Sequence, residues 1–103
     1  MKHLIITGFD PFGGETVNPS WEAVSRLPDV IGDYRLTKLQ IPTVFGTAAE
    51  TVLAAAMEDV PDVILCVGQA GGRDAVTPER IAVNMASARI PDNRGNQPVE
   101  TPI

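Results

Sequence analysis

The sequence predicts an α/β fold with three layers, α/β/α, in which helices cover both faces of a twisted, partly parallel sheet. Short apolar runs rich in β-branched residues alternate along the chain with segments of helical periodicity. Glycine-rich loops directly follow two of these runs, and ligands bind at such carboxyl ends of parallel strands. We expect one domain over residues 1–103, because no repeat or linker divides them.

The first strand and first helix have clear local signals. Residues 3–7 are apolar and include β-branched isoleucines, which predicts a buried strand. A helix is expected to begin at Asn18, because asparagine suits the N-cap and Pro19 fits the first helical position. Pro28 ends this helix. Residues 34–41 alternate imperfectly and predict a second strand, for which an edge position is left open.

The longest helix is expected to begin at Thr43 or Gly46, since alanine, valine and leucine then recur on one stripe. Residues 63–67 form a continuous apolar run of the kind found in central parallel strands. A further strand is expected over residues 81–85. From Pro91 onward the pattern dissolves into loop-forming residues.

Composition excludes several classes of function. The net charge is −5 and the eight basic residues are scattered, which argues against a nucleic-acid partner. No apolar run approaches the roughly 20 residues that span a bilayer, and the N-terminus lacks a signal-peptide pattern. The single cysteine cannot form an internal disulfide, so we expect a cytoplasmic protein without membrane contact.

The loop at residues 7–14 carries two phenylalanines among its glycines, Phe9 and Phe12. Aromatic rings on such a loop suggest a flat or apolar ligand. The sequence has neither of the glycine patterns that cradle nucleotide phosphates. No His, Cys, Asp or Glu grouping has metal-ligand spacing, so neither a metal nor another cofactor is expected.

Three blocks of uncommon residues in a fixed order resemble the amino-terminal half of the pyroglutamyl-peptidase I family. The blocks are residues 7–14 with Asn18-Pro19, residues 67–84, and residues 88–95. The resemblance implies a cysteine peptidase that removes pyroglutamate from peptide N-termini and commonly forms homo-oligomers. It also implies a catalytic set of a cysteine nucleophile, a histidine base and a glutamate that orients the histidine.

Glu79 matches the family glutamate. A carboxylate that accepts a hydrogen bond from an imidazole fixes its tautomer and stabilises the cation formed when it takes a thiol proton. From composition alone, a surface ion pair of Glu79 with Arg73, Arg80 or Arg89 is the more ordinary interpretation.

Phe9 and Phe12 match the family aromatics that hold the pyroglutamyl ring. That five-membered lactam is small and uncharged, so apolar contact can bind it. The resemblance also makes Asn18 and Gln69 candidates for hydrogen bonds to the ring amide, and it makes Arg89 a candidate for support of the oxyanion. The alternatives are core packing for the two rings and a helix cap for Asn18, which does not exclude a ligand role.

Neither Cys66 nor His3 fits the remaining catalytic roles. Cys66 is expected to be an inert packing residue inside an apolar strand, and His3 a solvated residue at the start of a strand, far from the loops. The resemblance implies that the nucleophile and the base lie downstream of these residues, so we expect these 103 residues alone to be inactive and the sheet to be incomplete. The alternative functions are a non-catalytic module that binds a small cyclic ligand, or an assembly fragment.

Overall fold

A computed structural model describes all residues from 1 to 103. Its main sheet has four strands in the order β2-β3-β1-β4, in which β1 runs parallel to β3 and β4, and β2 antiparallel to β3. A separate two-stranded ladder joins β5 and β6. The elements are β1 (Lys2–Phe9), α1 (Pro19–Ser25), β2 (Val30–Ile31), β3 (Tyr34–Ile41), α2 (Thr47–Glu58), β4 (Val63–Cys66), β5 (Met85–Ala86) and β6 (Thr101–Pro102).

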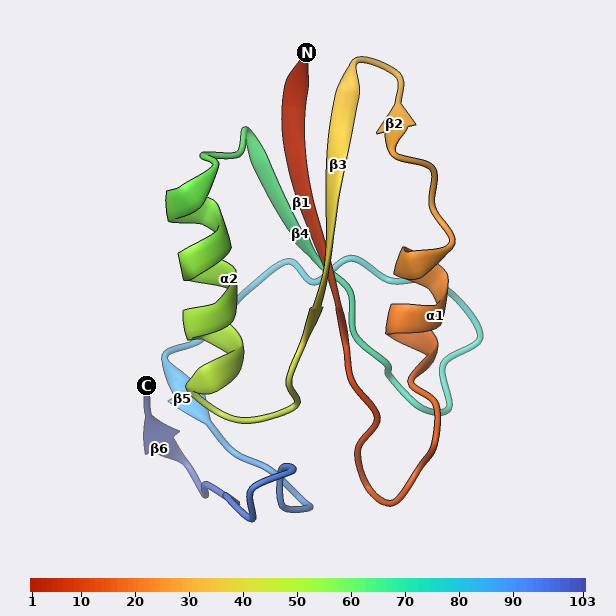
Figure 1. Ribbon diagram of the computed structural model, residues 1–103. Helices are drawn as coiled ribbons and strands as arrows, with labels where there is room; N and C mark the ends of the chain where they lie inside the picture. Colours follow the sequence, from red (N-terminus) through yellow and green to blue (C-terminus); the bar gives the residue numbers. More distant parts are fainter.

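The three-layer prediction is confirmed. Figure 1 shows the sheet nearly edge-on, with α1 and α2 on opposite sides of it. Strand β1 is flanked on both sides by other strands, and most of its residues, including Ile5 and Thr7, are buried. No helix is long and apolar enough to cross a membrane.

Helix α1 begins as its sequence predicts. The side chain of Asn18 accepts a hydrogen bond from the Ser20 N–H at 3.0 Å, and Pro19 occupies the first turn. Helix α2 begins after Gly46, whose φ of +79° is costly for residues with a side chain. Its apolar stripe is not buried within the described residues, because Leu53 and Met57 are exposed.

The expectation that residues 63–67 form a central strand is wrong. Strand β4 pairs only with β1, and all four of its residues are exposed, so it forms an edge of the sheet. Cys66 is consequently exposed as well, where a buried packing residue was expected. The apolar run indicates that the strand is suited to being covered on both faces, and no described element provides that cover.

Two further strand expectations need revision. Strand β3 is internal, because the short β2 turns back at Gly32 and pairs along its outer edge. Of the strand expected over 81–85, only Met85 is in a strand, the two-residue β5, which pairs with Thr101–Pro102. Residues 81–84 are exposed and have no neighbouring strand that would accept their backbone hydrogen bonds.

His3 is buried, with 3% of its surface exposed, where a solvated residue was expected. Its ring Nε2 lies 2.7 Å from Thr37 Oγ1, and its backbone N–H donates to Asp62 Oδ2 at 2.7 Å. Its Nδ1 lies 3.7 Å from Asp59 Oδ1. The turn between α2 and β4 therefore folds over the start of β1 and shields the imidazole from water.

Candidate functional site

The connections that follow β1 and β3 meet at the carboxyl end of the sheet, and Asp10 links them. Its Oδ1 accepts a hydrogen bond from the Thr43 N–H at 2.7 Å. Its backbone oxygen accepts from Thr43 Oγ1 at 3.0 Å and from Asn18 Nδ2 at 3.1 Å. Asp10 thus holds both the start of α1 and the connection between β3 and α2.

A third segment, residues 88–96, contacts the same two connections through Asn93. The Asn93 Nδ2 group donates to Asp10 Oδ1 at 3.2 Å and to the Pro11 backbone oxygen at 2.9 Å. The Asn93 N–H donates to the Thr43 backbone oxygen at 3.0 Å. Three loops that are distant in sequence therefore share one hydrogen-bond network.

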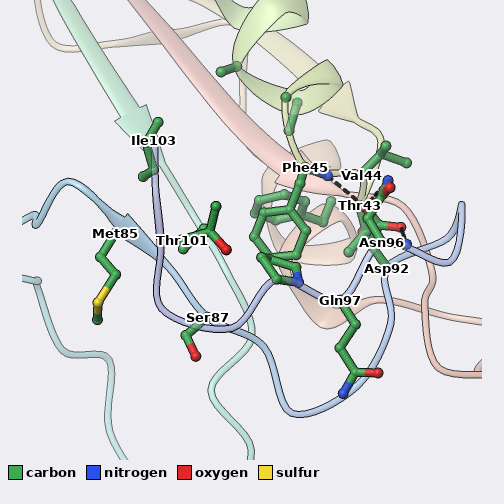
Figure 2. Close-up of a pocket in the computed structure, with 16 residues that line it drawn as sticks. Thr43, Val44, Phe45, Met85, Ser87, Asp92, Asn96, Gln97, Thr101 and Ile103 are labelled. Carbon is green, nitrogen blue, oxygen red and sulfur yellow. Dashed lines mark hydrogen bonds between the residues drawn. The ribbon is translucent and has the colours of Figure 1, made fainter.

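Asp92 fixes the other side of this segment. Its Oδ2 accepts from the Phe45 N–H at 2.8 Å and from Asn96 Nδ2 at 3.0 Å, as drawn in Figure 2. Its Oδ1 accepts from the N–H groups of Arg94 and Asn96, both at 2.9 Å. Burial raises the pKa of Asp92, but hydrogen bonds from Asn96, Phe45 and Arg94 outweigh it and lower that pKa to about 2.

A cavity of about 1040 Å³ opens beside this network. Figure 2 shows Phe45 on one side of it and Thr101, with the neighbouring Met85, on another. Its lining is half hydrophobic and includes Phe9 and Thr43. A smaller, wholly apolar hollow of about 400 Å³ also includes Phe9, together with residues of α2 and Cys66.

Phe9 is the predicted site residue that the structure places most clearly at a cavity. It ends β1, is half-buried and contributes to the lining of both hollows. A Cβ built on Gly68 would lie 3.8 Å from the Phe9 ring, so the glycine loop after β4 lies beside the end of β1. Gln69 follows directly and is exposed.

Phe12 and Asn18 lie close to this region without lining the larger cavity. Phe12 is half-buried in the loop after β1. Asn18 is buried and serves as the cap of α1, and its side chain also contacts Ser20 Oγ at 2.8 Å. These contacts use the amide oxygen and one amide hydrogen, so one hydrogen is left for another acceptor.

Glu79 and Arg89 are not brought to the cavity. Glu79 lies in the exposed segment between β4 and β5, its side chain is 79% exposed, and its Oε1 is 3.4 Å from Arg73 Nη1. That contact is one of the surface ion pairs considered from composition. Arg89 is also exposed and does not line the cavity.

Sequence reasoning missed three residues of the network, Asp10, Thr43 and Asn93. Their signal is weak, because aspartate, threonine and asparagine are ordinary loop residues. The placement of Asp10 between two phenylalanines, and of Asn93 in a Pro-Asp-Asn turn, is the only hint. No group of three or more His, Cys, Asp or Glu side chains is arranged to hold a metal ion.

Fold and site together define an α/β protein with a part-apolar cavity at the carboxyl end of a mainly parallel sheet. The chain belongs to the pyroglutamyl peptidase family, whose sequence model matches residues 2–103. The family resemblance that the three sequence blocks indicate is therefore confirmed.

Two pyrrolidone-carboxylate peptidases illustrate the similarity. The one from Levilactobacillus brevis is 62% identical over 97% of this chain and 49% of its own length. The one from Brevibacillus brevis is 55% identical over all of this chain and 48% of its own length. The chain therefore spans about half the length of these curated relatives.

Solved structures agree with the sequence comparisons. A crystal structure of pyroglutamyl peptidase I from Bacillus amyloliquefaciens superposes with a TM-score of 0.94 at 54% identity, covering 99% of this chain and 50% of the other. Pyrrolidone carboxyl peptidase from Pyrococcus furiosus gives a TM-score of 0.90 at 42% identity, covering 97% and 49%.

Proposed function

We propose that these residues provide the lactam-binding part and the catalytic glutamate of a pyroglutamyl-peptidase I, a cysteine peptidase that removes pyroglutamate from peptide N-termini. The observation that carries the proposal is the family match over residues 2–103. The half-buried ring of Phe9 beside a part-apolar cavity supports it, since a neutral lactam is bound by apolar contact.

In this proposal Phe9 and Phe12 hold the pyroglutamyl ring. Polar groups must then satisfy the ring N–H and C=O, because unpaired polar atoms in a closed site are costly. Gln69 is next to the glycine that faces Phe9, and Asn18 retains one amide hydrogen. These two side chains are our candidates for the hydrogen bonds to the lactam.

Glu79 is the proposed partner of the catalytic histidine. Its carboxylate is exposed, and its Arg73 contact at 3.4 Å is a solvent-exposed ion pair. Such a pair contributes little stability and is readily exchanged for an imidazole N–H. We propose that Arg89 supports the oxyanion from the neighbouring segment.

The nucleophile and the base are proposed to come from the half of the peptidase that these residues do not match. His3 lies at the opposite end of β1 and its ring is occupied by Thr37. Cys66 sits on an edge strand with no imidazole partner. We therefore expect no turnover by the isolated chain, and turnover that is abolished in Cys66→Ser would contradict this assignment.

A grafted peptidase tests the proposal directly. Residues 1–103 replace the matching half of the Levilactobacillus brevis relative, and release of chromophore from pyroglutamyl-p-nitroanilide is followed. We expect turnover by the graft, and a fall in kcat of at least about 100-fold in Glu79→Gln. Glu58→Gln, an equally isosteric change at the end of α2, is the control. A folded graft without turnover would refute the proposal.

A non-catalytic binding module is the alternative, because the cavity is present in these residues alone. Titration of the isolated chain with pyroglutamate, monitored by NMR, addresses it. Saturable binding together with an inactive graft would favour the module. We further propose that the peptidase acts in the cytoplasm, given the single cysteine, and assembles as a homo-oligomer.

A further inference from the structure

We propose that Asn93 is a positioning residue for lactam binding, which holds the backbone between the Phe9 and Phe12 rings in its binding conformation. This inference rests on the proposed function. It assigns a role to a side chain that neither binds the substrate nor takes part in the chemistry.

Asn93 holds this backbone through two hydrogen bonds from its side-chain amide, which together are called the brace below. Asn93 lies 83 residues from Asp10 in sequence, yet its Nδ2 donates to Asp10 Oδ1 at 3.2 Å and to the Pro11 oxygen at 2.9 Å. Both hydrogens of the amide are thereby used. Asp10 and Pro11 are the two residues between the two phenylalanines, so the brace acts on the backbone that sets the spacing of the rings.

The brace is extended to the cavity wall through Thr43. The same Asp10 Oδ1 accepts from the Thr43 N–H at 2.7 Å, and the Asn93 N–H donates to the Thr43 oxygen at 3.0 Å. Thr43 lines the larger cavity. Loosening Asn93 would therefore let the ring-bearing loop and the cavity wall move relative to one another.

The chemistry of the partners selects an amide at this position. Both are oxygens that only accept, one a carboxylate and one a carbonyl, so the residue must supply two donors. An aspartate of the same shape would instead place a charged oxygen against two oxygens. Asn93 is itself exposed, so packing in the hydrophobic core does not explain its role.

The test uses the grafted peptidase and separates binding from chemistry. We expect Asn93→Ala to raise KM for pyroglutamyl-p-nitroanilide about tenfold, with kcat within about twofold of the unchanged graft. Asn93→Asp should raise KM more at neutral pH. The ratio of its KM to that of the unchanged graft should fall toward pH 4, where an ordinary aspartate carboxyl becomes protonated, at about 3.9, and can donate. Gln40→Glu adds the same charge to an exposed side chain near the end of β3 and should leave KM unchanged.

A double-mutant cycle gives a second measurement. Asp10→Ala removes one acceptor of the brace, so the KM increase in the Asp10→Ala/Asn93→Ala variant should be smaller than the product of the single increases. Independent multiplication of the two effects would overturn the inference. So would variants that keep the KM of the unchanged graft at every pH, or that lose kcat and thermal stability with no change in KM.

The failure of the inference and that of the proposed function are distinguishable. A folded graft that does not cleave the substrate refutes the proposed function, and the inference with it. An active graft whose Asn93 variants keep its KM refutes the inference alone.

Discussion

Gly8 and Trp21 are in direct backbone contact. A Cβ built on Gly8 would lie 2.7 Å from both the Cα and the nitrogen of Trp21, closer than real side chains approach. The absence of a side chain lets α1 sit directly on β1. This seating also brings Ser20 Oγ to 2.9 Å from the Phe9 N–H, which donates to it, so helix packing and the position of the ring-bearing loop are linked.

Gly8→Ala is therefore expected to destabilise the protein. The added methyl group must push α1 away from β1, and overpacking of this kind costs about 1–3 kcal/mol. The free energy of unfolding from urea titration measures the effect. Gly71→Ala is the matched control, because a Cβ at that position meets no atom within 4 Å. Equal stability of the two variants would show that α1 moves away without cost.

Acid should loosen the segment around Asp92. The pKa of its carboxyl is lowered from 3.8 to about 2 in the folded protein, because hydrogen bonds to the charged form outweigh burial. A lowered pKa means that the stabilisation is fully present above about pH 4 and is lost as the pH falls through about 2. We expect hydrogen exchange at the Phe45 and Asn96 amides to accelerate in that range.

Asp92→Asn separates this effect from general acid denaturation. The new amide group would place its own hydrogens against the Phe45 N–H and Asn96 Nδ2 groups, which now donate to Oδ2. Hydrogen exchange at the Phe45 and Asn96 amides should therefore already be fast at neutral pH, and its rate should depend less on acid. Asp74→Asn is the control, because Asp74 is exposed and makes no side-chain hydrogen bond in the structure. A steep acid response that survives in Asp92→Asn would show that another group is responsible.

Local sequence signals predicted where the two helices begin. Asn18-Pro19 has the chemistry of a helix start, and Gly46 supplies the positive φ that precedes α2. The resemblance of the three sequence blocks to one family predicted that the chain belongs to that family. The structure brings residues of the first and third blocks together through Asn93.

Long-range placement was not predictable from the same signals. Residues 63–66 are apolar enough for a central strand, yet strand order is decided by partners that local sequence does not encode. His3 carries no mark of burial, since the residues that cover it lie near position 60. The roles of Asp10 and Asn93 depend likewise on a contact between residues 83 positions apart.

The buried contact between His3 and Thr37 is expected to contribute to stability. The 2.7 Å contact is a diagonal one between side chains of β1 and β3, because His3 is in register with Arg35 and Thr37 with Ile5. A double-mutant cycle with His3→Leu and Thr37→Val should give a coupling free energy of about 1 kcal/mol, the usual net worth of such a bond. Additive single effects would show that the histidine contributes through packing alone.

The exposed edge of β4 is expected to drive self-association of the isolated chain. Its residues Val63, Ile64 and Leu65 are each more than 40% exposed, and one side of the strand has no hydrogen-bonding partner. Unprotected apolar edge strands pair with other chains, and a lysine on the edge prevents this. Leu65→Lys should therefore lower the mean mass found by light scattering at high protein concentration.

Val76→Lys is the matched control, because Val76 is 99% exposed and lies between β4 and β5, outside any strand. It adds the same charge and removes a side chain that is more exposed than Leu65, so only a change specific to β4 should alter the mean molar mass. Thermal unfolding of both variants shows whether the fold is retained. Association through β4 would be contradicted if the unmodified chain were monomeric, or if the mean molar mass fell equally in both variants.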